Sequence, residues 1–265
     1  MQRPVRVLVI AGSDSGGGAG IQGDIKTITA LCAYAATAIT AVTVQNTNGV
    51  SRSHAIPPEI VADQINAVLA DIGADAVKTG MLVSAAVVGA VADSLRNYRE
   101  IPLVVDTVMS AKGGAALLDD HGVDALQTSL FPLASLITPN IPEAERLTGT
   151  TIANPEDMIT AAERLQRFGA RAVLVKGGHL EGDIVTDILM DGSGVYRFSA
   201  PRLDNRSSHG TGCALASAIA TGLAKGMPLD SAIQMAREFV RGAIAGGLPL
   251  GRGIGPINHL HASGK

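Results

Sequence analysis

The segment His209-Gly210-Thr211-Gly212-Cys213 places glycines, a hydroxyl and a thiol directly ahead of the apolar run Ala214–Ala220. Glycine leaves backbone amides uncovered, and the first turn of a helix adds unpaired N–H donors and the positive end of the helix dipole. This arrangement predicts a phosphate cradle formed by Gly210, Thr211 and Gly212. The helix start would also lower the pKa of Cys213, giving a thiolate that accepts a proton or attacks a substrate. The alternative is that the glycines only turn the chain and Cys213 is a small buried side chain.

Polar side chains that suit phosphate chemistry follow other apolar runs of the sequence. Asp106, Asn140 and Glu143 offer the oxygen ligands by which Mg²⁺ is held beside phosphates. We expect the two carboxylates to be the metal ligands and Asn140, with Lys176 and Thr211, to bind the nucleotide. Lys176 adds a positive charge for a phosphate. Each of these residues alone is an ordinary solvated side chain, but together with the cradle they favour phosphoryl transfer from a nucleotide.

Gln45 ends a short apolar run, and its amide can donate and accept hydrogen bonds at once. Such an amide suits a heteroaromatic ring that carries an amino group, although an unliganded glutamine at a strand end is equally ordinary. Met81 and Val108 would supply apolar walls for the ring, and core packing would explain both without a ligand.

The glycine-rich segment from Gly12 to Gly20 lacks the Lys-Ser/Thr ending of a P-loop and the spacing of a dinucleotide-binding loop. A flexible loop over a small ligand or a plain turn are the two interpretations left open. Asp24, one turn into the helix that follows, would face that ligand or complement the helix N-terminus.

The elements that must position these residues alternate along the chain. Short, continuous apolar runs predict strands buried on both faces of a parallel sheet, at 7–11, 41–44, 75–78, 103–105, 135–138 and 172–175. Helical spacing predicts helices between and after them, at 21–33, 58–71, 84–98, 123–131, 142–147, 155–168 and 230–245.

The expected fold class is therefore α/β, with a mostly parallel central sheet and helices on both faces. The segments 184–190 and 195–198, separated by a turn, predict an antiparallel hairpin at one edge of this sheet. Ligands bind at the carboxyl ends of the strands in such folds, where the polar clusters described above lie.

The composition limits the classes of function. The chain has 265 residues, 46% of them hydrophobic, and a net charge of −3 without any run of Lys or Arg, which argues against a nucleic-acid partner. No apolar stretch is long enough for a membrane helix, and the first residues do not form a signal peptide, so we expect a cytoplasmic protein. Cys32 and Cys213 show no metal-ligand spacing. Without a linker or repeat, one domain over residues 1–265 is the simplest expectation.

Several motifs, in order along nearly the whole chain, resemble the hydroxymethylpyrimidine/phosphomethylpyrimidine kinase family of thiamine biosynthesis. They are Ala11-Gly12-Ser13-Asp14, Gly17–Gln22, Val44–Thr47, Gly80–Leu82, Asp106–Met109, Ile137–Asn140, Lys176–His179 and Ser208–Cys213. The resemblance implies a ribokinase-like fold, ATP with Mg²⁺, and a homodimer. It also implies two successive phosphorylations of 4-amino-5-hydroxymethyl-2-methylpyrimidine, first to the monophosphate and then to the diphosphate.

The resemblance also assigns roles to single residues. Gln45 matches the pyrimidine-binding glutamine of the family, and the residues around the ring would be Gly12, Asp24, Val44, Met81 and Val108. Cys213 matches the residue that replaces the aspartate base of other ribokinase-like enzymes, and Gly210 to Gly212 match the anion hole. Arg237 stands where relatives carry a nucleotide-contacting lysine, so a bidentate guanidinium would replace a point charge.

Three alternatives stay open at this point. Pyridoxal kinases share the fold, but relatives specialised for pyridoxal carry a cysteine where this chain has Ala111, in the loop 107–122 that could close over the site. Cys213 could instead be the nucleophile of a thiol hydrolase with His209 as its base. A non-catalytic pyrimidine sensor would need Gln45 but not the cradle, Lys176 and the acidic residues together.

Overall fold

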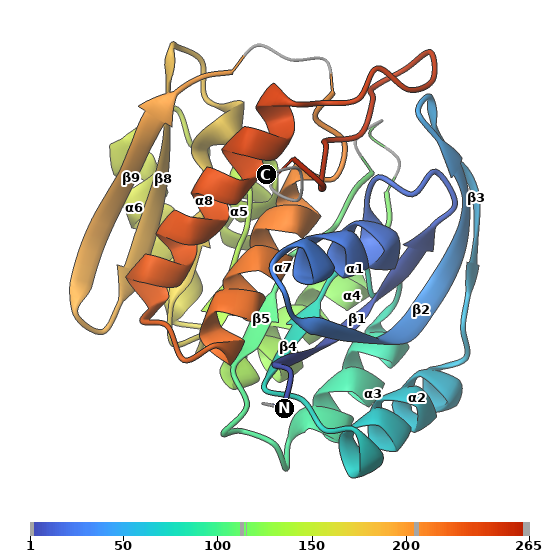
Figure 1. Ribbon diagram of the computed structural model, residues 1–265. Coiled ribbons are helices and arrows are strands. Elements are labelled where there is room, and N and C mark those ends of the chain that lie inside the picture. Colours follow the sequence, from blue (N-terminus) through green and yellow to red (C-terminus); the bar gives the residue numbers. More distant parts are fainter. Residues whose placement is uncertain (1–2, 112–113, 115, 204–206, 262–265) are drawn as a thin grey trace.

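The structure is a computed structural model that describes residues 3–111, 114, 116–203 and 207–261. Within these residues one nine-stranded sheet runs through the molecule in the order β3-β2-β1-β4-β5-β6-β7-β8-β9 (Figure 1). The strands are β1 (Arg6–Asp14), β2 (Tyr34–Asn46), β3 (Gly49–Ala55), β4 (Ala76–Thr79), β5 (Leu103–Val105), β6 (Leu136–Ile137), β7 (Val173–Val175), β8 (Ile184–Asp191) and β9 (Gly194–Pro201).

The central strands are parallel to one another; in sheet order they are β2, β1, β4, β5, β6 and β7. Antiparallel pairs form both edges, β2 with β3 on one side, and β7 with β8 and β8 with β9 on the other. The α/β prediction with a mostly parallel sheet is confirmed, and so is the hairpin over 184–198. The β2–β3 pair was not foreseen. Its second strand, Gly49–Ala55, is polar and mostly exposed, so the sequence carries no apolar pattern there.

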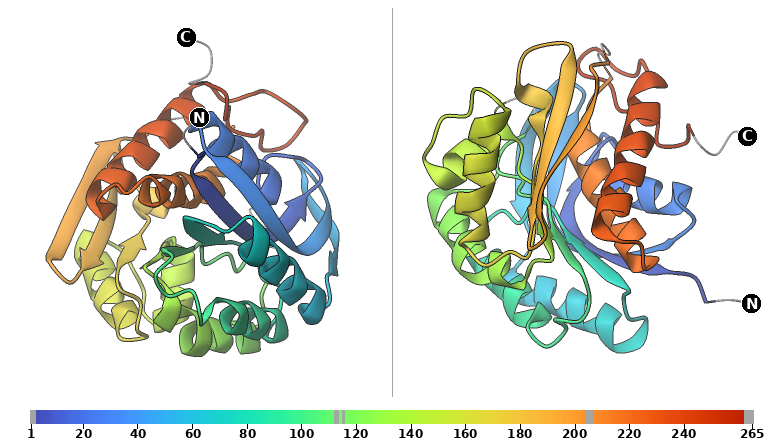
Figure 2. Two further views of the ribbon diagram at one scale, coloured as in Figure 1. Left: turned by 60° about the horizontal axis from the view of Figure 1, so that its bottom comes forward. Right: turned by 90° about the vertical axis from the view of Figure 1, so that its left-hand side faces the viewer.

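Helices cover both faces of the sheet in two layers (Figure 2). One layer contains α1 (Gly20–Ala30), α7 (Thr211–Ala224) and α8 (Leu229–Ala245). The other layer contains α2 (Pro58–Asp71), α3 (Ala85–Leu95), α4 (Asp120–Ala125), α5 (Ile141–Thr148) and α6 (Pro155–Gln166). No helix in the described part of the chain is both long and apolar enough to cross a membrane.

The helix predicted over 123–131 is interrupted. The chain forms α4, then a π-helical turn over Leu126–Leu130 and a 3₁₀ turn over Phe131–Leu133, where Pro132 lacks the N–H that a continuing helix needs. The other predicted helices agree with the structure to within a few residues. The helix expected over the apolar run Ala214–Ala220 is longer in the structure, where α7 spans Thr211–Ala224.

Burial explains the parallel core. In β1 the run Val7–Ala11 is 0–1% exposed, with alternate side chains packed into the two helical layers. A strand covered on both faces needs apolar residues at every position, which is why the run is continuous. Asp14 and Lys78 lie in the last two residues of β1 and β4, and Asp106 and Lys176 directly follow β5 and β7, so the fold gathers these charges at one edge of the sheet.

Candidate active site

A cavity of about 740 Å³ lies at the carboxyl ends of the parallel strands. Most residues expected to form the site line it, namely Gly12, Gln45, Met81, Asp106, Val108, Asn140, Glu143, Lys176, Gly210, Thr211, Gly212, Cys213 and Arg237. Segments from both ends of the chain therefore share one cavity of the size that holds small ligands.

The cradle is built at the start of α7. Gly210 is the N-cap, with φ of 89°, a left-handed conformation that favours glycine. A Cβ on Gly210 would lie 1.9 Å from the carbonyl oxygen of Gly18, so the cradle and the glycine-rich loop pack directly together. Thr211 and Gly212 follow in the first turn of the helix, where N–H groups lack intrahelical partners. The geometry thus agrees with an anion site at this helix start.

Lys176 lies beside the cradle. Its Nζ is 3.0 Å from Oδ1 of Asp106, and a Cβ on Gly212 would lie 3.4 Å from the same Nζ. Burial alone would raise the pKa of Asp106, but Lys176 and Lys78 outweigh burial and hold that pKa below its ordinary value. Asp106 is therefore a carboxylate, and the ammonium beside it lies next to the amides that would receive a phosphate.

Glu143 and Asn140 form the N-terminal cap of α5. The side chain of Asn140 accepts from the N–H of Glu143, and Oε2 of Glu143 accepts from the N–H of Asn140 and from the Thr107 hydroxyl, each at 2.9 Å. Burial is the main reason that the pKa of Glu143 is raised. This capping box fixes both side chains at the rim of the cavity.

The donor set fits a metal ion that arrives with a nucleotide. Among the described residues, no three His, Cys, Asp or Glu side chains gather closely enough to hold an ion. Mg²⁺ often takes only one or two carboxylates and completes its shell with phosphate oxygens and water. Asp106 and Glu143 both line the cavity next to Lys176, which is what such a shared site requires.

The prediction that the helix start lowers the pKa of Cys213 is wrong. Burial raises the pKa of this thiol to about 12, and the nearby carboxylates of Asp106 and Asp24 raise it further, while Lys78 and the N–H of Gly20 act in the opposite direction. Cys213 is partly exposed to the cavity, but the loss of solvation around its sulfur outweighs the effect of the helix terminus. In the free protein Cys213 is a thiol.

Two residues expected around the ring do not line the cavity. Asp24 lies on α1 with its side chain fully buried, and its oxygens pair with Lys78 and accept from the Ser217 hydroxyl. Val44 is 54% exposed, because alternate residues of β2 point to opposite faces and Thr43 and Gln45 take the face toward the cavity. Both expectations are corrected: Asp24 pairs with Lys78 instead of facing the cavity, and Thr43 rather than Val44 lines the cavity.

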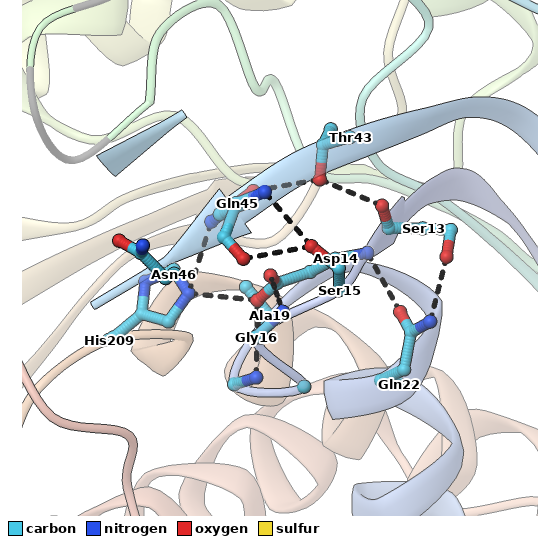
Figure 3. A network of polar contacts seen from close by, with 12 residues as sticks. Ser13, Asp14, Ser15, Gly16, Ala19, Gln22, Thr43, Gln45, Asn46 and His209 are labelled. Atoms are coloured by element: carbon cyan, nitrogen blue, oxygen red, sulfur yellow. Dashed lines mark hydrogen bonds and ion pairs between the residues drawn. The ribbon is translucent and has the colours of Figure 1, made fainter. Parts of the chain in front are cut away.

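The glycine-rich loop is held by Asp14 (Figure 3). The carboxylate of Asp14 accepts from the backbone N–H groups of Gly16, Gly18 and Ala19, at 2.7, 3.1 and 2.9 Å, and its Oδ2 is 3.0 Å from Nε2 of His209. Burial would raise the pKa of Asp14, but these donors outweigh it and lower the pKa. The loop is therefore an ordered turn that His209 ties to the cradle.

Gln45 reaches the same cluster from the end of β2. Its Oε1 is 3.1 Å from the Thr43 hydroxyl, and its Nε2 is 3.3 Å from Nε2 of His209 (Figure 3). The Ser15 hydroxyl donates to the backbone carbonyl of Gln45 and accepts from its backbone N–H. The backbone and the side chain of Gln45 are thus both fixed.

Arg237 of α8 lines the cavity and is already paired. Its guanidinium forms an ion pair with Asp187 of β8 and lies 5.9 Å from the centre of the Phe198 ring. Asp187 also accepts from the N–H of Gly177, next to Lys176. A contact between Arg237 and a nucleotide stays a prediction.

The structure argues against the hydrolase alternative. His209 would have to reach Cys213 to act as its base, but its Nε2 faces Asp14 and Gln45. The groups that influence the Cys213 thiol are Lys78, Asp106, Asp24 and the N–H of Gly20. No nucleophile–base pair of the kind that thiol hydrolases use is formed by these two residues.

Lys78, Thr43 and Asp14 also line the cavity, although no role was expected for them from the sequence. Each stands at or next to the end of an apolar run, which is the signal that singled out Gln45 and Asp106. Lys78 pairs with Asp24 and Asp14 with His209, and pairing across more than fifty residues of sequence is not visible in a local pattern.

Comparisons with known proteins agree with this geometry. A family model described as phosphomethylpyrimidine kinase matches residues 14–258. A thiamine biosynthesis bifunctional protein of Geobacter sulfurreducens is 56% identical over 97% of this chain, which spans only 52% of that relative. A hydroxymethylpyrimidine/phosphomethylpyrimidine kinase of Streptomyces coelicolor is 50% identical over 99% of this chain and 97% of its own. The crystal structure of an ADP complex of Bacillus subtilis pyridoxal kinase matches with a TM-score of 0.92, at 34% identity, over 99% of this chain and all of that one.

Proposed function

The chain belongs to the phosphomethylpyrimidine kinase family, and from this premise we propose that it phosphorylates 4-amino-5-hydroxymethyl-2-methylpyrimidine with ATP. The first transfer goes to the hydroxymethyl oxygen and the second to the phosphate so formed. The observation that supports this proposal most directly is that one cavity joins an amide suited to an aminopyrimidine, Gln45, to a glycine cradle suited to a phosphoryl group.

Different residues of the cavity would bind the ring, the phosphate and the metal ion. The ring would lie against Gln45 between Met81 and Val108, with its hydroxymethyl group toward Cys213. The terminal phosphate of ATP would lie over the cradle, where the amides from Gly210 to Gly212 and the ammonium of Lys176 stabilise charge on the phosphoryl group. Asp106 and Glu143 would hold Mg²⁺, which when bound neutralises charge on the phosphate oxygens.

Cys213 is the candidate proton acceptor for the first transfer. The accepting form is the thiolate, which Lys78 and the N–H of Gly20 favour and burial opposes. The thiol of the free protein cannot accept a proton, so this role requires Cys213 to give its own proton to solvent before the transfer. The thiolate so formed then takes the hydroxyl proton as the phosphoryl group is transferred.

Pyridoxal is the second candidate substrate, because the pyridoxal kinase of Bacillus subtilis has so similar a fold. Ala111 lines the cavity in this chain, at the place where relatives specialised for pyridoxal carry a cysteine. Without a thiol there to capture the aldehyde, we expect pyridoxal to be the poorer substrate. The neighbouring residues 112, 113 and 115 of the loop 107–122 lie outside the described residues, so its closure over the site stays a prediction.

Purified protein, ATP, Mg²⁺ and the hydroxymethylpyrimidine test the proposal when the phosphorylated products are separated and counted. We expect the monophosphate first, then the diphosphate, with one ADP released for each phosphate transferred. Pyridoxal at equal concentration is the comparison. Absence of both pyrimidine phosphates, or faster turnover of pyridoxal, would overturn the proposal. The homodimer implied by the resemblance and the cytoplasmic location expected from the sequence stay predictions, and light scattering tests the first.

A further inference from the structure

The hydrogen-bond partners of His209 determine which way the side-chain amide of Gln45 faces. Oδ2 of Asp14 lies 3.0 Å from Nε2 of His209, and a carboxylate can only accept. Nε2 of His209 must therefore carry a hydrogen, whether the ring is neutral or charged. A nitrogen that carries this hydrogen cannot accept from the Gln45 amide, yet the amide lies 3.3 Å from it. Two N–H donors facing each other repel, so the group of Gln45 nearest His209 must be its oxygen.

The hydrogen bonds of Thr43, at the other end of the amide, also require this orientation of Gln45. Its hydroxyl has one hydrogen, and the carbonyl oxygen of Ser13, 2.9 Å away, can only accept. Toward Gln45, 3.1 Å away, the hydroxyl oxygen must then accept, which requires the amide nitrogen at that end. A half-turn of the amide exchanges its nitrogen and oxygen without moving other atoms, and it satisfies both neighbours at once.

We propose that His209 and Thr43 are specificity-determining residues that lock the Gln45 amide with its oxygen toward His209 and its nitrogen toward Thr43. The inference rests on the proposed function for its ligand, since all three side chains line the same cavity. One N–H and one lone pair of the amide remain for that ligand. The acceptor lies on the His209 side and the donor on the Thr43 side.

An amide held in one orientation accepts only one order of hydrogen-bond donor and acceptor on the edge of its ligand. An aminopyrimidine edge carries an amino donor beside a ring-nitrogen acceptor, so the amino group must lie on the His209 side. The corresponding 4-oxo pyrimidine carries the reverse pattern, a ring N–H beside a carbonyl oxygen, and meets donor against donor and acceptor against acceptor. Such mismatches leave buried polar groups unpaired, which is the strongest basis for rejecting an analogue of the same shape.

The first experiment compares kcat/KM for the amino substrate and its 4-oxo analogue. We expect wild-type protein to prefer the amino substrate at least about a hundredfold. In the double variant His209→Leu/Thr43→Val the amide can turn to suit either ring, so this preference should fall at least about tenfold, the equivalent of one hydrogen bond. Thr43→Ser keeps the hydroxyl and should keep the preference.

Ser15→Ala is the matched control, because Ser15 holds the backbone of Gln45 without touching its amide. We expect this variant to lower overall activity without changing the ratio between the two substrates. An unchanged ratio in the double variant, in protein whose ADP affinity shows that it is folded, would overturn the proposal. A ratio lowered equally by Ser15→Ala would also overturn it, because loosening of the loop would then explain the result.

The second experiment needs no variant and no activity. In protein labelled with ¹⁵N at histidine, NMR should show a proton on Nε2 of His209, whether or not Nδ1 is also protonated. A neutral ring with its proton on Nδ1 alone would overturn the proposal, since Nε2 would then accept from the amide. If wild-type protein phosphorylates neither pyrimidine, the proposed function fails, while this measurement still decides the orientation of the amide.

Discussion

Asp24 of α1 and Lys78 of β4 form an ion pair in which Nζ lies 2.8 Å from Oδ2 and both side chains are 0% exposed. Ser217 of α7 donates a third contact, to Oδ1 at 2.6 Å. Desolvation of such charges is tolerated only when every charge has a partner of good geometry. The pair therefore links three elements beneath the cavity and places the charge of Lys78 near Cys213.

Removing one member of this pair should destabilise the protein. We expect Asp24→Ala to lower the free energy of unfolding by about 3–5 kcal/mol, because it leaves the ammonium of Lys78 buried without its partner. The double variant Asp24→Leu/Lys78→Met should recover most of this loss, since no charge is then left buried. Urea unfolding of the three proteins measures the difference. Equal stability of wild type and Asp24→Ala would contradict the buried pairing.

The raised pKa of Cys213 makes a separate prediction about its reactivity. Only the thiolate is alkylated, and a pKa of about 12 leaves very little thiolate at neutral pH. In a Cys32→Gly background, the rate of alkylation by iodoacetamide should rise about tenfold per pH unit from pH 7 to 10 without a plateau. Glycine suits position 32 because its φ is 57°.

Unfolding in urea supplies the control for that measurement. In the unfolded chain the Cys213 thiol is solvated, so alkylation should level off above a pKa near 8.5. A plateau below pH 8 in the folded protein would show that the helix start, rather than burial, dominates at the sulfur.

The sequence predicted the parallel core and the position of the site because both depend on local signals. A run such as Val7–Ala11 is continuous only when a strand is covered on both faces, and the polar residues after each run must meet at one edge. Gln45 and Lys176 were found in this way and Cys213 from the glycines ahead of an apolar helix, and all three line the cavity.

Most of the wrong predictions concern features that depend on residues distant in sequence. Whether Asp24 of helix α1 faces a ligand or a lysine depends on Lys78, which reaches it from strand β4. The pKa of Cys213 depends on how deeply α7 is packed, and the local motif carries no measure of that burial. Val44 was misplaced for a simpler reason, since the alternation of β2 assigns the cavity face to Thr43 and Gln45.

Gly210 provides a test of the cradle itself. Gly210→Ala should reduce kcat/KM at least tenfold, because a left-handed φ of 89° costs a non-glycine residue about 1–3 kcal/mol and a Cβ would collide with the carbonyl of Gly18. Gly89→Ala is the matched control, since a Cβ on this α3 residue meets nothing within 4 Å and alanine favours a helix. Steady-state kinetics with both variants measures the effect. Undiminished activity in Gly210→Ala would show that the phosphoryl group does not use these amides.

The two proposed phosphorylations differ in their need for Cys213. The acceptor of the first transfer is a hydroxyl that must lose a proton, whereas the acceptor of the second is a phosphate that is already ionised. We therefore expect Cys213→Ala to slow the first transfer by about 10²-fold or more, as for loss of a proton acceptor, and the second by less than about tenfold. Separate rates with the alcohol and with its monophosphate measure the two effects, and ATP affinity serves as the control for folding. Equal loss in both transfers would instead mean that the sulfur shapes the cradle and takes no part in moving the proton.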